Sequence, residues 1–115
     1  GFVLLYNGSF QYFSGSTPLI SGGTMPLSTW IHIALCRSSG STRLFVNGTQ
    51  VGSTAFDNSN YNESTVLARG PFIGSNYVPG DFFNGYMDEF RVTKAARYTA
   101  NFTPPTSAFL DTGPT

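Results

Sequence analysis

A chain of 115 residues is long enough to build one domain around a single hydrophobic core and too short for two. Only 10% of the residues are charged, and six Lys and Arg balance six Asp and Glu, so the sequence provides no basic surface for nucleic acid or for an anionic membrane. The single cysteine, Cys36, excludes an internal disulfide, and no apolar run approaches the roughly 18 residues that span a bilayer.

Short segments rich in Val, Ile, Phe, Tyr and Thr alternate with clusters of Gly, Pro, Asn and Ser, which predicts an all-β sandwich or barrel. The first two segments, residues 2–6 and 9–13, flank Asn7-Gly8. This dipeptide readily adopts the positive φ angles of a tight turn, so we expect a β-hairpin. Residues 14–29 contain a Gly-Gly pair and two prolines, and we expect a looser stretch there.

Residues 30–37 are a strong strand candidate with two apolar faces. Alternate positions place Ile31, Ile33 and Leu35 on one face and Trp30, His32, Ala34 and Cys36 on the other. Apolar residues on both faces predict a strand in the middle of a sheet, with its second face covered as well.

The second hairpin signal is Asn47-Gly48, which separates predicted strands at residues 43–46 and 50–53. Residues 55–69 are polar and rich in Asn, so we expect a long loop. A short strand is predicted at residues 71–75.

Residues 83–93 form the longest strand candidate. Its faces are Tyr86, Asp88, Phe90 and Val92 on one side and Met87, Glu89 and Arg91 on the other. Residues 94–101 are predicted to form a helical turn that ends at Pro104 and Pro105, and residues 106–115 an extended tail or linker.

Four segments in order resemble a known family: WIHIALCR at 30–37, RLFVNG at 43–48, FIG at 72–74 and FNGYMDEFRV at 83–92. Together they are similar to the laminin G-like domains of the concanavalin A-like fold. The resemblance covers most of the chain. It implies an antiparallel β-sandwich of the jelly-roll type over residues 1–105.

The resemblance also bears on the N-terminus and on the source of the chain. Domains of this family usually begin with further strands before the segment that matches Gly1, so we expect the strand at 83–93 to lack a neighbour here. Upstream residues or another chain would complete the sheet. Residues 96–105 are similar to the ends of such domains in bacteriophage and bacterial structural proteins, which indicates an extracellular location or a virion surface.

The concanavalin A-like fold also includes glucanases, whose two catalytic carboxylates share one cleft. This chain offers Asp88 and Glu89, which face opposite ways if residues 83–93 form a strand, so a retaining glycosidase is disfavoured. His32 and Cys36 have no nucleophile motif around them, and we expect both to serve in packing. The sequence therefore predicts no enzyme and no catalytic residues.

Many laminin G-like domains hold calcium at the rim of the sandwich, which makes the Asn-rich segment a candidate metal site. Its oxygen-bearing residues are Asp57, Asn58, Asn60, Asn62 and Glu63. The turn glycine and the downstream bidentate Glu of a calcium loop are missing, so a solvated loop without a cofactor is the favoured interpretation. Asp81 is a second, weaker candidate.

Four aromatic residues outside the expected core could stack on sugar rings: Tyr12, Tyr61, Tyr77 and Phe82. Partial core packing is the alternative for each of them. The leading hypothesis is a structural or adhesive module on a particle or cell surface, specifically a phage virion component. Such a module would be oligomeric or part of a larger chain and would bind neighbouring protein subunits or host-surface glycans. The alternative is a carbohydrate-binding lectin domain of a secreted multidomain protein.

Overall fold

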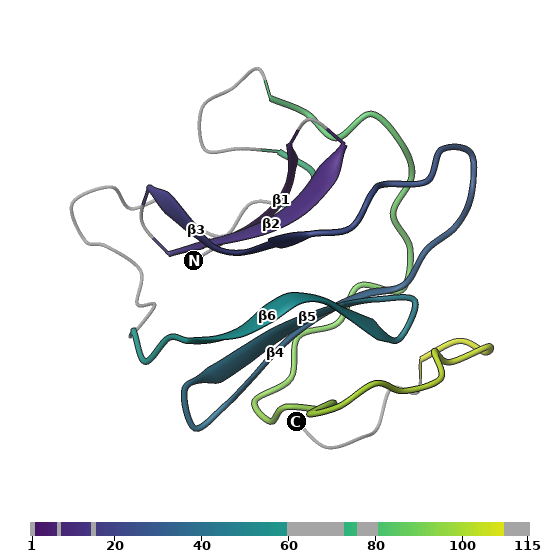
Figure 1. Ribbon diagram of the computed structural model, residues 1–115. Helices are drawn as coiled ribbons and strands as arrows, with labels where there is room; N and C mark the ends of the chain where they lie inside the picture. The colour runs from purple at the N-terminus through teal and green to yellow at the C-terminus, as the bar shows by residue number, and fades with distance from the viewer. Residues whose placement is uncertain (1, 7, 15, 60–72, 76–80, 110–115) are drawn as a thin grey trace. The chain divides into compact units, whose positions relative to one another are not determined.

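The computed structural model describes residues 2–6, 8–14, 16–59, 73–75 and 81–109, and its regular elements are all β-strands (Figure 1). The chain divides into two compact units, one of residues 1–59 and 93–115 and the other of residues 60–92. We describe each unit by itself. No helix long and apolar enough to cross a membrane occurs among the described residues.

The first sheet of the larger unit contains β1 (Phe2–Tyr6), β2 (Ser9–Ser14) and β3 (Thr17–Gly22), all antiparallel and in chain order. The predicted first hairpin is confirmed, because Tyr6 pairs with Ser9 and Gly8 has a φ of 76°. The expectation of a looser stretch after residue 14 was wrong for β3. Pro18 obscured this strand in the sequence, yet proline is tolerated at a sheet edge, where no neighbour needs its missing N–H.

The second sheet contains β4 (Ile33–Ser38), β5 (Ser41–Val46) and β6 (Thr49–Phe56), again antiparallel and in chain order. Both connections are two-residue turns in which both residues have positive φ: 49° and 82° at Ser39-Gly40, and 51° and 80° at Asn47-Gly48. This is the turn geometry that matches the twist of a β-hairpin. The second predicted hairpin is therefore confirmed.

β4 differs from its prediction in start and in position. It begins at Ile33 because the side chain of Asn47 accepts the N–H of His32 at 2.9 Å, in place of a strand carbonyl. Among the described strands β4 pairs with β5 alone, so the expectation of a central strand was wrong. Trp30 lies before the strand and is 68% exposed.

The two sheets pack face to face, with β3 close to β6 (Figure 1). The core between them contains Phe10, Tyr12, Ile20 and Leu44, with partly buried apolar residues around them. At the β3–β6 contact two backbones meet, since a Cβ on Gly22 would lie 2.8 Å from the backbone nitrogen of Gly52. The predicted all-β sandwich is therefore confirmed.

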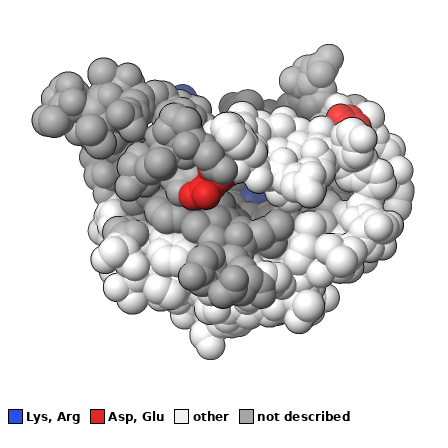
Figure 2. Space-filling model, turned by 90° about the horizontal axis from the view of Figure 1, so that it is seen from above, with Lys and Arg blue, Asp and Glu red and all other residues white. Residues whose placement is uncertain are grey.

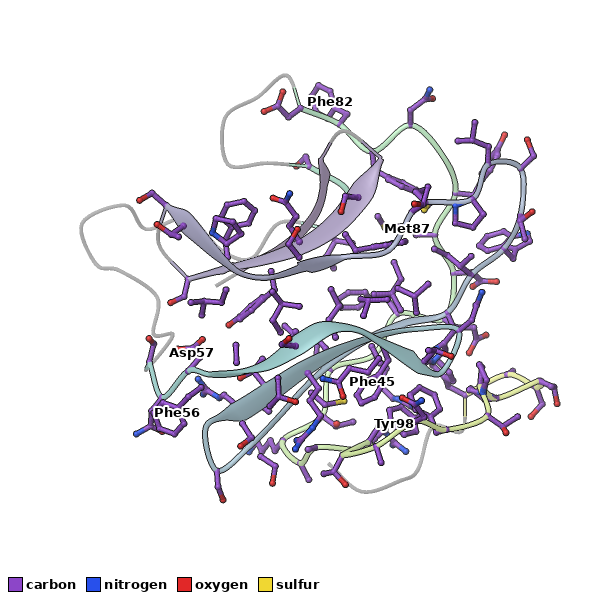
Figure 3. All side chains as sticks on the ribbon, viewed as in Figure 1. Phe45, Phe56, Asp57, Phe82, Met87 and Tyr98 are labelled. Atoms are coloured by element: carbon purple, nitrogen blue, oxygen red, sulfur yellow. The ribbon has the colours of Figure 1, made fainter. Side chains whose placement is uncertain are left out.

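The outer face of the second sheet is covered by the chain's own residues 93–109. Figure 3 shows Phe45 pointing from the sheet towards Tyr98. The ring centroid of Phe45 lies 6.4 Å from that of Tyr98 and 5.3 Å from that of Phe102, both edge to face. The helical turn expected at 94–101 was wrong, because backbone and side chain here bond to the β5–β6 hairpin. Phe102 N–H donates to Gly48 O at 2.9 Å, and Asn101 Oδ1 accepts Gln50 N–H at 2.9 Å.

The smaller unit contains no strand among its described residues, 73–75 and 81–92. One antiparallel bridge joins Ser75 to Phe82, and Phe83 N–H donates to Gly74 O at 2.8 Å. The strand expected at 83–93 was therefore wrong for this structure, and the one expected at 71–75 is reduced to the bridge. A strand needs a neighbour for its backbone groups, and the described residues of this unit offer none beyond Ser75.

Candidate functional site

A buried hydrogen bond joins two residues that the sequence assigned to different candidate sites. Tyr12, a candidate for sugar stacking, lies on β2 and is only 3% exposed. Its hydroxyl donates to Oδ2 of Asp57, a candidate calcium ligand, at 2.7 Å. Asp57 follows β6, as Figure 3 shows, so this bond connects the two sheets at the rim of the core. Tyr12 therefore belongs to the core and presents no ring face to a ligand.

The segment around Asp57 is held by further bonds. Ser59 N–H donates to Asp57 Oδ1 at 3.0 Å, and Asp57 N–H donates to Gly40 O at 2.7 Å. The guanidinium of Arg37 donates to Ser59 O at 2.7 Å and to Asp57 O at 3.3 Å. The polar groups of Asp57 thus support the fold, as buried polar groups usually do.

The other proposed metal ligands are not assembled around Asp57 in the described structure. Asn58 is exposed beside it, Asp81 is exposed in the smaller unit, and Asn60 lies outside the described residues, as do Asn62 and Glu63. Within the described ranges no three His, Cys, Asp or Glu side chains are grouped to hold a metal ion. Calcium therefore has no described cage to occupy.

The remaining aromatic candidates lie in the smaller unit. Phe82 is 70% exposed and presents its ring to solvent. Tyr61 and Tyr77 lie outside the described residues. A sugar-stacking role of these three residues stays a prediction.

The carboxylates of Asp88 and Glu89 do not lie on a strand, so our argument that they face opposite ways was wrong. Both are exposed, Glu89 has a φ of 53°, and its N–H donates to Asp88 Oδ1 at 2.8 Å. Exposure to bulk water is unlike the desolvated setting that gives a glycosidase acid its raised pKa. His32 packs edge-on against Phe102, with ring centroids 5.5 Å apart, in agreement with its expected packing role.

The sequence analysis missed a run of exposed apolar side chains before and along β4. These residues, which we call the apolar strip, are Leu27, Trp30, Ile33 and Leu35, and their side chains are 85%, 68%, 42% and 39% exposed. Ser28 has a φ of 54°, and Thr29 Oγ1 donates to Leu27 O at 3.2 Å within this turn. We had assigned Trp30 to a covered face, and its place beside the Ser-Thr turn was the signal against that assignment.

The surroundings of the apolar strip carry no charge. The first charged residue of the sequence is Arg37, so none precedes or interrupts the strip. On the face shown in Figure 2, acidic and basic side chains are also sparse among the described residues. An exposed apolar surface without charges is typical of a contact surface for another molecule.

Comparison with known families agrees with this architecture. The chain matches the laminin G-type model of the concanavalin A-like lectin/glucanases superfamily over residues 2–101. Searches of the curated proteins and of the solved structures found no match. Because the match spans most of the chain and the larger unit is a two-sheet β-sandwich, the chain belongs to the concanavalin A-like lectin/glucanases superfamily as a laminin G-like domain.

Proposed function

We propose that this domain is a non-enzymatic assembly module that binds neighbouring protein subunits on a particle or cell surface, in particular as a component of a phage virion. Membership in the superfamily indicates a binding module, and domains of this kind are commonly extracellular. The similarity of residues 96–105 to the ends of domains in bacteriophage and bacterial structural proteins supports the virion surface.

The observation that carries the proposal is the apolar strip. Leu27 and Trp30 expose most of their surface, and Trp is among the residues that contribute most to protein–protein binding. Protein interfaces bury apolar side chains at their centre and have few charges there, which the strip matches.

The second candidate is a lectin, favoured by the 70% exposure of the Phe82 ring. Aromatic rings stack on the apolar faces of sugars, so Phe82, with Tyr61 and Tyr77, would form its platform. The chain would then be a carbohydrate-binding domain of a secreted multidomain protein.

A glycan array separates the two candidates. We expect no saturable binding of the whole chain to any sugar. Saturable binding that is lost in Phe82→Ala, Tyr61→Ala or Tyr77→Ala, but kept in the exposed control Phe56→Ala, would instead establish the lectin and overturn the assembly module.

An activity assay tests the absence of catalysis. We expect no release of reducing sugar from β-glucans by the whole chain. Hydrolysis that is abolished by Glu89→Gln would show a glycosidase and contradict the proposal.

A further inference from the structure

We infer that the open edge of β4 pairs with β4 of a second copy of this chain, so that two second sheets join into one continuous antiparallel sheet. This inference rests on the proposed function as an assembly module and names the surface and partner involved. It adds strand pairing through the backbone to the apolar contact already described.

The hydrogen-bond pattern of the β4–β5 hairpin shows which backbone groups are available. Asn47 N–H donates to His32 O at 2.8 Å, so this pair is a hydrogen-bonded one, and such pairs alternate along an antiparallel ladder. Ile33, Leu35 and Arg37 occupy the intervening pairs. Their N–H and C=O groups therefore point away from β5, to a side on which no described strand lies.

The side chains along this edge lack the features that proteins use to prevent strand addition. Such features are inward-pointing charges, Lys, Pro and bulges. The stretch Ile33 to Cys36 has none of them, and no register shift interrupts its pairing with β5. Arg37 is the one charge of β4, and its guanidinium is directed to the carbonyls of Asp57 and Ser59.

A second copy fits this edge better than a charged peptide does. The edge offers apolar side chains and unpaired directions of the backbone, and it has no run of one charge that would select an oppositely charged partner. The net charge of zero removes repulsion between copies. A two-fold axis at Leu35 sets this residue against itself and keeps the two Arg37 side chains at opposite ends of the paired segment, as an isologous contact requires.

The test is the oligomeric state of the whole chain, measured by sedimentation velocity over a wide concentration range. We expect a concentration-dependent dimer whose dissociation constant rises by about tenfold or more in Leu35→Lys, because a lysine at the edge must be desolvated. Leu19→Lys is the matched control, since Leu19 is also 39% exposed but lies on β3 of the other sheet. It should dimerise like the unmodified chain, and circular dichroism should show both variants folded.

Hydrogen exchange gives an independent readout. The amides of Ile33 and Leu35 should exchange fast in dilute protein and slowly in the dimer, while those of Ala34 and Cys36, which bond to β5, are slow in both. A chain that stays monomeric, or a dimer that Leu35→Lys leaves intact, would overturn the inference. Slow exchange of Ile33 and Leu35 in a monomer would do so too, because another segment of the same chain would then cover the edge.

Failure of this inference is distinguishable from failure of the proposed function. A monomer that binds no glycan loses only the β4 contact and keeps the assembly module open to other subunits. Saturable glycan binding by the Leu35→Lys monomer would overturn the assembly module itself.

Discussion

Leu35 on β4 and Leu44 on β5 face each other in the sheet, yet their environments are opposite. Leu44 is fully buried in the core, whereas Leu35 is 39% exposed. Both are leucines in strands of equal length that share one hairpin. The difference comes from position: β5 has a strand on each side, the first sheet over one face and residues 93–109 over the other, whereas β4 lies at the edge.

This comparison shows that an apolar pattern alone does not determine burial. Each face of a strand becomes buried only where another element covers it, and that element can be distant in sequence. The matched pair of leucines therefore offers a direct measure of what the cover contributes.

The largest expected effect is at Leu44. Leu44→Ala should lower the free energy of unfolding by about 3 to 5 kcal/mol because it leaves a cavity that the sandwich cannot close. Leu35→Ala removes the same atoms from a half-open site, where water can follow, and should cost about 1 kcal/mol. Urea denaturation at low protein concentration measures both, and equal costs would show that β4 is covered in solution.

The cover over the outer face of β5 can be tested next, through Gly48. A Cβ at this position would collide with the carbonyl oxygen of Phe102, and the φ of 80° is unfavourable for alanine. Gly48→Ala should therefore cost about 2 to 3 kcal/mol, from backbone strain and from the loss of the Phe102 N–H to Gly48 O hydrogen bond.

Gly8→Ala is the control for that variant, because Gly8 has a φ of 76° but nothing within 4 Å of an added Cβ. It reports backbone strain alone, about 1 to 2 kcal/mol. If the two alanine variants are equally stable in thermal denaturation, residues 101–104 do not hold the hairpin.

The smallest of these effects concerns the polar bond at the end of the covered core. Tyr12→Phe deletes the hydroxyl that donates to Asp57 and should cost about 1 to 2 kcal/mol, because a buried acceptor loses one donor. Tyr86→Phe, at an exposed site, should leave the urea midpoint unchanged. A Tyr12→Phe midpoint equal to that of the unmodified chain would mean that water replaces the hydroxyl.

The elements that were predictable from sequence are those specified by neighbouring residues. Asn7-Gly8 and Asn47-Gly48 identify both hairpins because few dipeptides favour two successive positive φ angles. β3 was missed because Pro18 disfavours a central strand, and only the sheet order shows that β3 is an edge. Residues 83–92 have a clear strand alternation, but pairing depends on a neighbour that the local sequence does not specify.

The candidate sites were less predictable, for a related reason. Asp57 was recognised as an oxygen donor, but its partner Tyr12 lies 45 residues away, and no local pattern links them. Trp30 was assigned to a covered face by alternation alone. The turn at Ser28 and Thr29, which ends that alternation, shows why the tryptophan is exposed instead.

The order of the strands has a consequence for folding kinetics. Both sheets are meanders in which each strand pairs with its neighbour in sequence, so these pairings close short loops and can form quickly. Docking of the two sheets joins residues as distant as Tyr12 and Asp57 and is the step that a large contact order slows. We therefore expect Tyr12→Phe to lower the refolding rate in stopped-flow experiments, whereas a hairpin already formed before docking would leave that rate unchanged.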